Sequence, residues 1–133
     1  MTTTLEMVKE FHDAFNISSP NVPSIDNNDV NSLRVSLLKE EVSELQTALA
    51  CRNEVEVLDA LTDIQVVLDG AYLALGYSRA KLEAFKIVHN SNMAKLGPDG
   101  RPILRADGKI MKPDGWKKPD LSLIVEGLKM LSY

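Results

Sequence analysis

Five acidic side chains recur at helical spacing in two neighbouring stretches, and this pattern limits the folds open to the chain. Glu41 and Glu44 lie three residues apart, and Glu56, Asp59 and Asp63 lie three and four residues apart. Residues at these intervals share one side of an α-helix. The pattern therefore predicts two consecutive helices, each with carboxylates gathered on one side. Carboxylate oxygens gathered in this way bind hard divalent cations, so a metal site is one candidate use.

Apolar residues spaced three and four apart predict four helices in the part of the chain before residue 96. Asp29, Asn53 and Ser78 are candidate N-caps for the second, third and fourth of these helices. A short fifth helix is expected from about Asp120, and no strand pattern interrupts the first four. The predicted ranges are 1–15, about 29–50, about 53–75 and about 78–95.

The segment after the fourth helix has a different character. Ile103–Leu104 and Ile110–Met111 flank Asp107–Gly108, a dipeptide typical of hairpin turns. We therefore expect a small β-hairpin near residues 100–113. The predicted fold class is all-α, a four-to-five-helix bundle with this hairpin as an excursion. A chain of 133 residues has the length of one domain, so a single domain over residues 1–133 is expected.

The charge and the apolar content exclude several classes of partner. The net charge of −4 gives no general attraction for nucleic acid. The longest apolar stretch, residues 55–75, is interrupted by acids and cannot span a membrane. The single Cys51 excludes an internal disulfide and fits a reducing compartment. Because the N-terminus also lacks an apolar signal core, we expect a cytoplasmic protein without nucleic-acid or membrane partners.

The acids of the third predicted helix lie apart from its polar side. Thr62, Gln65 and Asp69 mark that polar side, and the three acids lie about 100° round from it, in line with Gly70. Carboxylates that continue an apolar face are costly to bury unless a metal ion or a cationic partner faces them. If the second and third helices pack antiparallel about the turn at 51–53, the two acidic patches face each other. The alternative is that these acids are solvated or pair along their own helix, as acids at this spacing usually do.

Longer motifs around these acids resemble a known group of enzymes. The E-E-x-x-E motif at 40–44, followed by EVLDALTD at 56–63, resembles the MazG-like all-α nucleoside triphosphate pyrophosphohydrolases. Where small phage or bacterial members read D-A-L-A-D-x-x-Y-V-x-x-G, this chain reads DALTDIQVVLDG, and its later HNSNMAKLGPDGRPILRADGKIMKPDGW is also similar. The superfamily includes phosphoribosyl-ATP pyrophosphohydrolase and the dimeric dUTPases. The resemblance covers about residues 30–120.

The first motif of the family supplies metal ligands, and the resemblance implies Mg²⁺ as the cofactor, with Mn²⁺ as an alternative. Glu41 and Glu44 match the last two acids of this motif and are the expected ligands and catalytic residues. Glu40 lies nearly opposite the apolar stripe of the same helix and is expected to face solvent.

The second motif, E-x-x-D, can be placed in two ways. Glu56 and Asp59 fit it literally, whereas alignment on the later part of the helix places its last acid at Asp63 and its first at Ala60, which cannot bind metal. We expect Asp63 and Asp59 to bind the ion, with Glu56 as the next candidate.

The implied reaction converts a nucleoside triphosphate, either NTP or dNTP, to the monophosphate and pyrophosphate, with Glu41 or Glu44 as the base. Such an acidic site also needs cations for the phosphates. The N-x-x-K of Asn92 and Lys95 resembles a phosphate-contacting stretch of the family. Arg34 could instead pair with an acid, and Trp116 could serve ordinary packing. The substrate-binding candidates are Arg34, His89, Asn92, Lys95, Lys112 and Trp116.

The long apolar third helix predicts hydrophobic surface that a monomer leaves exposed, and the resemblance also implies self-association. We therefore expect a homodimer or a dimer of dimers. Two other functions stay open at this point. One is a non-catalytic helical dimer that binds a nucleotide or a protein partner. The other is a pyrophosphohydrolase acting on a different phosphoanhydride, such as phosphoribosyl-ATP.

Overall fold

The computed structural model describes residues 1–130 and is all-α, with 62% of these residues in helices. The described part of the chain has five α-helices and one short 3₁₀ turn, η1, at Ser78–Ala80, and it has no β-strand. The all-α fold class predicted from the apolar spacing is thus confirmed. The helices are α1 (Thr4–Ala14), α2 (Asn28–Ala50), α3 (Glu54–Ala74), α4 (Lys81–Met93) and α5 (Ser122–Met130).

The ends of the first three helices are set by their capping residues. The Thr3 hydroxyl accepts a hydrogen bond from the Glu6 amide, and the Glu6 side chain accepts one from the Thr3 amide, which forms a capping box for α1. Asn53 caps α3, as predicted. The N-cap of α2 is Asn27, whose side chain accepts hydrogen bonds from two amides of the first turn, so the prediction of Asp29 as this cap was wrong by two residues.

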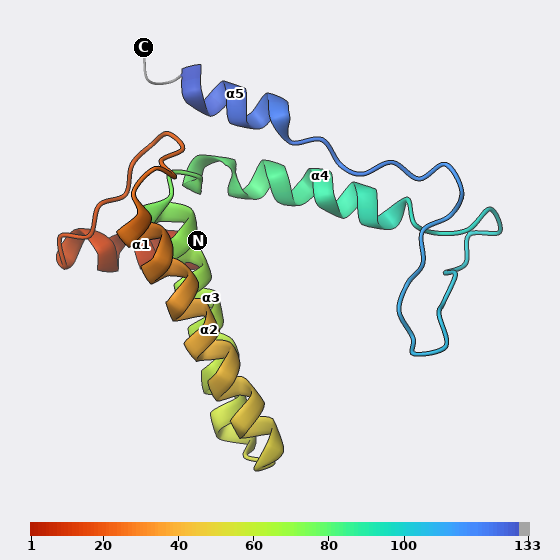
Figure 1. The fold of residues 1–133 in the computed structure, drawn as a ribbon, viewed down its shortest axis with the longest axis horizontal. Helices are drawn as coiled ribbons and strands as arrows, with labels where there is room; N and C mark the ends of the chain where they lie inside the picture. Colours follow the sequence, from red (N-terminus) through yellow and green to blue (C-terminus); the bar gives the residue numbers. More distant parts are fainter. Residues whose placement is uncertain (131–133) are drawn as a thin grey trace. The chain divides into compact units, whose positions relative to one another are not determined.

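The chain divides into two compact units, the first comprising residues 1–79 with the end of α5 from Leu128, and the second comprising residues 80–127. In the first unit α2 and α3 lie side by side, as Figure 1 shows, and α1 packs on α3. Because only Cys51–Asn53 separates α2 from α3, the two helices run antiparallel. Small buried side chains, including Ala48 of α2 and Ala60 of α3, bring their backbones close together. The single domain expected from the chain length stays a prediction.

The buried side of α3 differs from the one expected from its sequence. Asp69, placed on the polar side by its position round the helix, is fully buried, and its carboxylate accepts a hydrogen bond from Gln65 Nε2 at 3.1 Å. A Cβ on the neighbouring Gly70 would lie 2.9 Å from Arg34 Nη1 and 3.3 Å from His12 Nε2. Polar side chains from α1, α2 and α3 thus lie along the buried side of α3, and one of them, Asp69, was expected to face solvent.

The second unit begins at the last residue of η1 and holds α4, the loop of residues 97–116 and the first part of α5. The β-hairpin predicted near residues 100–113 was wrong, because the segment forms only isolated bridges, one of which joins Leu104 to Ile110. The predicted turn is present, with Gly108 at a φ of +89°. Ile103, Leu104 and Ile110 remain 40–58% exposed. No second layer covers these side chains within the unit, so little apolar burial is gained from a strand pair.

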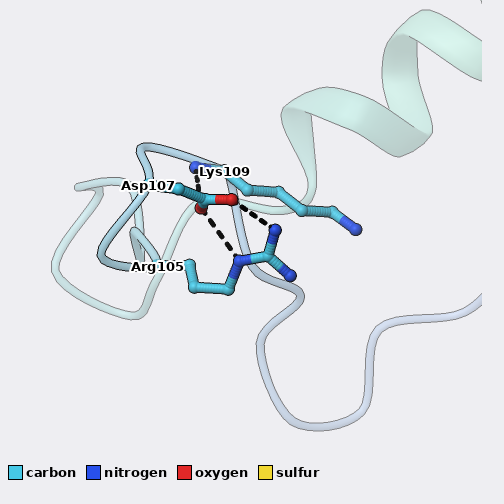
Figure 2. A network of polar contacts seen from close by, with 3 residues as sticks. All are labelled: Arg105, Asp107 and Lys109. Carbon is cyan, nitrogen blue, oxygen red and sulfur yellow. Dashed lines mark hydrogen bonds and ion pairs between the residues drawn. The ribbon is translucent and has the colours of Figure 1, made fainter.

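A polar network closes the turn of this loop. Figure 2 shows the Asp107 carboxylate between Arg105 and Lys109. It accepts a hydrogen bond from Arg105 Nε at 2.9 Å and one from the Lys109 amide at 3.1 Å, and it forms an ion pair with Arg105 Nη2. The pairing lowers the pKa of Asp107 and raises the pKa of Arg105. These charges are therefore satisfied locally.

No helix of residues 1–130 is both long enough and apolar enough to cross a membrane. This agrees with the prediction from the acids that interrupt residues 55–75.

Candidate functional site

Three carboxylates from α2 and α3 meet near the middle of the antiparallel pair. Glu41 and Glu44 lie one turn apart on α2, and Asp63 faces them from α3. One ligand oxygen from each of the three lies within 4.8 Å of the other two. We call this set the carboxylate group. The two acidic patches therefore face each other, as the antiparallel packing predicted.

The carboxylate group concentrates negative charge, and no cation acts on Glu41 among the described residues. Glu41 is half-buried, and its Oε2 is fully buried without a hydrogen-bond partner among the described residues. Burial is the main cause that raises the pKa of Glu41, followed by interaction with the Glu44 carboxylate and by repulsion from Asp63 and Glu40. An unpaired buried carboxylate oxygen is costly, so the arrangement fits a ligand that removes the charge.

A hard divalent cation matches the chemistry of these three side chains. All the available ligand atoms are carboxylate oxygens, which are the ligands preferred by Mg²⁺ and also suit Mn²⁺. Mg²⁺ is usually held by one or two carboxylates together with water and phosphate oxygens. Glu41, Glu44 and Asp63 could therefore hold the ion and leave coordination positions for a phosphate chain.

The other two acids of the second patch lie beside the carboxylate group and are not part of it. Glu56 and Asp59 are exposed, and both line a cleft that also includes Glu44. Of the second-patch acids expected to bind metal, the structure brings only Asp63 together with the α2 carboxylates. Glu40 is exposed, as expected for a residue on the solvent side of α2.

The cleft between the turn-proximal halves of α2 and α3 has a volume of about 440 Å³. Its lining includes the buried side chains of Ala48 and Ala60 and the exposed acids Glu44, Glu56 and Asp59. The sequence analysis did not identify this cleft. The sequence signal that could have identified it is the occurrence of small side chains, including Ala48 and Ala60, on both helices near the turn. The remaining lining residues are Ser43, Thr47, Cys51 and Asn53.

A second group forms in the unit of residues 80–127, from residues that the sequence nominated for substrate binding. The Lys95 ammonium lies 5.3 Å from the centre of the Trp116 ring, and that of Lys112 lies 4.9 Å from it. Lys95 also donates a hydrogen bond of 2.9 Å to Asn92 Oδ1. The Trp116 indole N–H donates to the Ser91 carbonyl at 2.8 Å, which fixes the ring. We call Asn92, Lys95, Lys112 and Trp116 the lysine–tryptophan group.

The remaining two candidates from the sequence lie outside both groups. His89 is exposed on α4. Arg34 is 8% exposed, lies beside Gly70 and His12, and forms no ion pair with an acid among residues 1–130. The pairing of Arg34 with an acid, one of the two roles expected for it, is therefore absent there.

Comparison with known proteins agrees with this geometry. A sequence model of the family described as phosphoribosyl-ATP pyrophosphohydrolase matches residues 8–92, which is more than half of the chain. The matched range contains Glu41, Glu44 and Asp63, and it ends before Lys95. No curated protein matches the chain.

Proposed function

The chain belongs to the phosphoribosyl-ATP pyrophosphohydrolase family, and from this premise we propose that it hydrolyses a nucleotide between its α and β phosphates in a metal-dependent reaction. The family lies in the MazG-like all-α NTP pyrophosphohydrolase superfamily, whose members act on phosphoanhydrides. Water is added across the α–β bond, and the products are the monophosphate and pyrophosphate. Phosphoribosyl-ATP is the first substrate we propose, and simple NTPs or dNTPs are the alternative.

The observation that carries this proposal is the carboxylate group with the unpartnered Oε2 of Glu41. Mg²⁺, or Mn²⁺ in its place, would be held by Glu41, Glu44 and Asp63, and when bound it supplies charge neutralisation for phosphate oxygens and lowers the pKa of a water molecule. A structural role gives no reason to gather three acids in a place where burial and the neighbouring acids disfavour the charged form of Glu41. A role in binding a cation does give that reason.

We propose Glu44 as the residue that accepts the proton of the attacking water. It belongs to the carboxylate group and also lines the 440 Å³ cleft, so a molecule held there lies against its side chain. Glu41 is less suited to this role because its buried Oε2 faces away from bulk water. Catalysis of phosphoryl transfer depends mostly on positioning and on charge stabilisation, so proton removal is the smaller contribution.

The lysine–tryptophan group has the chemistry for contacting a nucleotide. Two ammonium groups can bind phosphate oxygens, and a fixed indole ring offers a surface for a base. We propose that Lys95 and Lys112 contact substrate phosphates and that Trp116 contacts the base. Replacing either lysine by methionine tests the first role, because KM for the substrate should rise while binding of the metal alone stays unchanged.

We also propose that the protein is a homodimer or a dimer of dimers in the cytoplasm. Large apolar side chains on α1, α2 and α3 are exposed, such as Phe11 at 49%, Leu49 at 57% and Leu58 at 67%. Surfaces of this kind commonly mark interfaces between subunits. Sedimentation at several protein concentrations tests this, and a monomer at all of them would contradict it. The exposed thiol of Cys51 fits a reducing compartment.

The activity is tested by incubating the protein with phosphoribosyl-ATP and a panel of NTPs and dNTPs, with Mg²⁺, with Mn²⁺ and with EDTA, and resolving the products. We expect monophosphate and pyrophosphate only when metal is present. The matched variants are Glu44→Gln, Asp63→Asn and, as the control on the exposed side of α2, Glu40→Gln. No turnover of any nucleotide, with metal binding equal in all three variants, would favour the non-catalytic helical protein instead. Release of a single phosphate would also contradict the proposal.

A further inference from the structure

Arg34 carries a positive charge that no acid among the described residues of the first unit offsets through an ion pair. Its side chain is 8% exposed, and its Nε is buried without a hydrogen-bond partner among the residues that the structure describes. Burial lowers the pKa of the guanidinium, but an arginine keeps its proton in proteins. A buried charge without a partner is strongly unfavourable, whereas the same charge next to a bound anion is not.

The described groups around Arg34 do not form an ion pair with its guanidinium. His12 lies beside it and is 2% exposed, with its Nδ1 3.3 Å from Ser19 Oγ. Burial and the nearby Arg34 lower the pKa of His12, so the neutral form of the imidazole is favoured. The absence of a side chain at Gly70 makes room for both groups. The carboxylate of the next residue, Asp69, accepts a hydrogen bond from Gln65.

Arg34 also lines a cavity of about 420 Å³, within the range of small-molecule sites, roughly 300–1,000 Å³. The cavity lies between the start of α2 and the loop of residues 17–24. That loop is fixed to the end of α3, because the Ser24 amide donates to the Leu75 carbonyl at 2.9 Å, and a Cβ on Gly76 would lie only 1.8 Å from the Val22 carbonyl oxygen. Polar groups in the lining come from Ser18, Ser24 and Asn27.

We propose that this cavity is an anion subsite in which Arg34 binds a phosphate monoester. Arginine matches phosphate because its planar donors can form two parallel hydrogen bonds to it. Hydroxyl and amide groups of Ser18, Ser24 and Asn27 are suited to the remaining phosphate or sugar oxygens. Arg34 precedes Glu41 by seven residues, which places it on the same side of α2, about 10 Å along the axis.

The phosphate monoester could belong to the substrate or to a separate molecule. Phosphoribosyl-ATP carries a 5-phosphoribosyl group on its adenine ring, at the end opposite the triphosphate, whereas ATP lacks it. Arg34, two helical turns from the carboxylate group, is placed to bind that second phosphate and so to distinguish phosphoribosyl-ATP from ATP. This part of the inference rests on the proposed function, but the existence of the subsite does not.

Binding of ribose 5-phosphate tests the subsite without any hydrolysis. The sugar phosphate is titrated calorimetrically into the full-length protein in EDTA. We expect saturable binding to the wild type, binding at least about tenfold weaker in Arg34→Gln, since a charge-assisted hydrogen bond is lost, and unchanged binding in the control Lys39→Gln, which removes an exposed charge from the same helix. Should Arg34→Gln fail to fold, Arg34→Lys keeps the charge but loses the paired donors, and the same weakening is expected. No binding to the wild type, or equal affinity in wild type and Arg34 variants, would overturn the proposal.

Kinetics then separate the two sources of the phosphate. If it belongs to the substrate, Arg34→Gln lowers kcat/KM for phosphoribosyl-ATP at least about tenfold and leaves that for ATP unchanged. If it belongs to a separate molecule, the variant loses ribose 5-phosphate binding while both substrates change equally. Should neither nucleotide be hydrolysed by the wild type, the proposed function fails, but the calorimetric result still decides the subsite.

Discussion

Arg105 and Asp107, at the turn of the loop of residues 97–116, satisfy each other through an ion pair and hydrogen bonds. In the α2–α3 pair, by contrast, Glu41 lies against two other acids, Glu44 and Asp63. The effect on acidity has opposite signs in the two regions. Pairing lowers the pKa of Asp107, whereas burial and neighbouring acids raise the pKa of Glu41.

The contrast distinguishes charges that are paired within the protein from charges that have no oppositely charged partner among its described residues and are suited to binding a ligand. Asp107 is exposed, and its partner Arg105 lies two residues away, so this ion pair contributes little to the stability of the fold. The carboxylate group has the opposite character, because three acids from two helices converge and one of their oxygens is buried without a partner. Arg34, on the same helix as Glu41, is a positively charged side chain that also has a buried polar atom without a hydrogen-bond partner among the described residues.

The largest effect is expected on catalysis. Asp63→Asn keeps the size of the side chain but removes a charge from the carboxylate group, and we expect kcat/KM to fall by at least about 100-fold. The matched change in the loop, Asp107→Asn, should leave the rate unchanged. Steady-state release of pyrophosphate measures both. Equal rates in the two variants would remove the distinction between the regions.

A smaller effect is expected on thermal stability in the presence of metal. Ligand binding to the native state stabilises it, by about 2.7 kcal/mol at a metal concentration 100 times Kd. Differential scanning calorimetry should therefore show a rise in Tm with Mg²⁺ in the wild type and in Asp107→Asn. The rise should be absent in Glu41→Gln. A metal-dependent rise of the same size in Glu41→Gln would place the ion elsewhere.

The pH dependence of stability should have opposite signs at Glu41 and Asp107. Because the pKa of Glu41 is raised, Glu41 contributes fully to folding stability when the pH is below 4.5, the ordinary pKa of a glutamate. This contribution is lost as the pH rises through the raised pKa. Because the pKa of Asp107 is lowered, Asp107 contributes to folding stability when the pH is above 3.8, the ordinary pKa of an aspartate. This contribution is lost as the pH falls through the lowered pKa.

Urea unfolding in EDTA over a series of pH values measures these contributions. Glu41→Gln should gain stability relative to the wild type as the pH rises above 4.5. Asp107→Asn should have a lower free energy of unfolding than the wild type at neutral pH, and this difference should disappear at low pH. A gain for Glu41→Gln that grows towards low pH would contradict the assigned sign.

The smallest effect is expected from Arg105→Gln. This change breaks the exposed ion pair with Asp107, and such pairs contribute little to stability. We expect unchanged activity, an unchanged metal response and a barely detectable decrease in the urea midpoint. A large loss of activity would show that the loop has a role in the reaction that its local pairing does not reveal.

Much of the first unit could be predicted from sequence, because its signals are local. Apolar spacing gave the helices, the side chain of Asn53 gave the start of α3, and the short turn after α2 implied that the two acidic patches face each other. The choice among Glu56, Asp59 and Asp63 could not be made in this way. It depends on how far α3 is rotated and shifted against α2, which small residues such as Ala48 and Ala60 determine through their packing.

Features that depend on three segments at once were the hardest to predict. Asp69 is polar and lies on the polar side of a helical wheel, yet it is buried because α3 also packs against α1. The unpartnered state of Arg34 depends on the space above Gly70 and on the position of His12, neither of which has a periodic signal. The β-hairpin was predicted from a correct turn signal, but no apolar layer covers its side chains.

Direct binding of Mn²⁺ tests the central claim, that Glu41, Glu44 and Asp63 form the metal site. Titration without nucleotide, followed by electron paramagnetic resonance of the free ion, gives the affinity of the wild type and of the variants Glu41→Gln, Asp63→Asn and Glu40→Gln. We predict that the first two variants lose saturable binding and that Glu40→Gln, altered one residue away on the exposed side of α2, keeps it. Equal Mn²⁺ affinity in all four proteins would contradict the assignment.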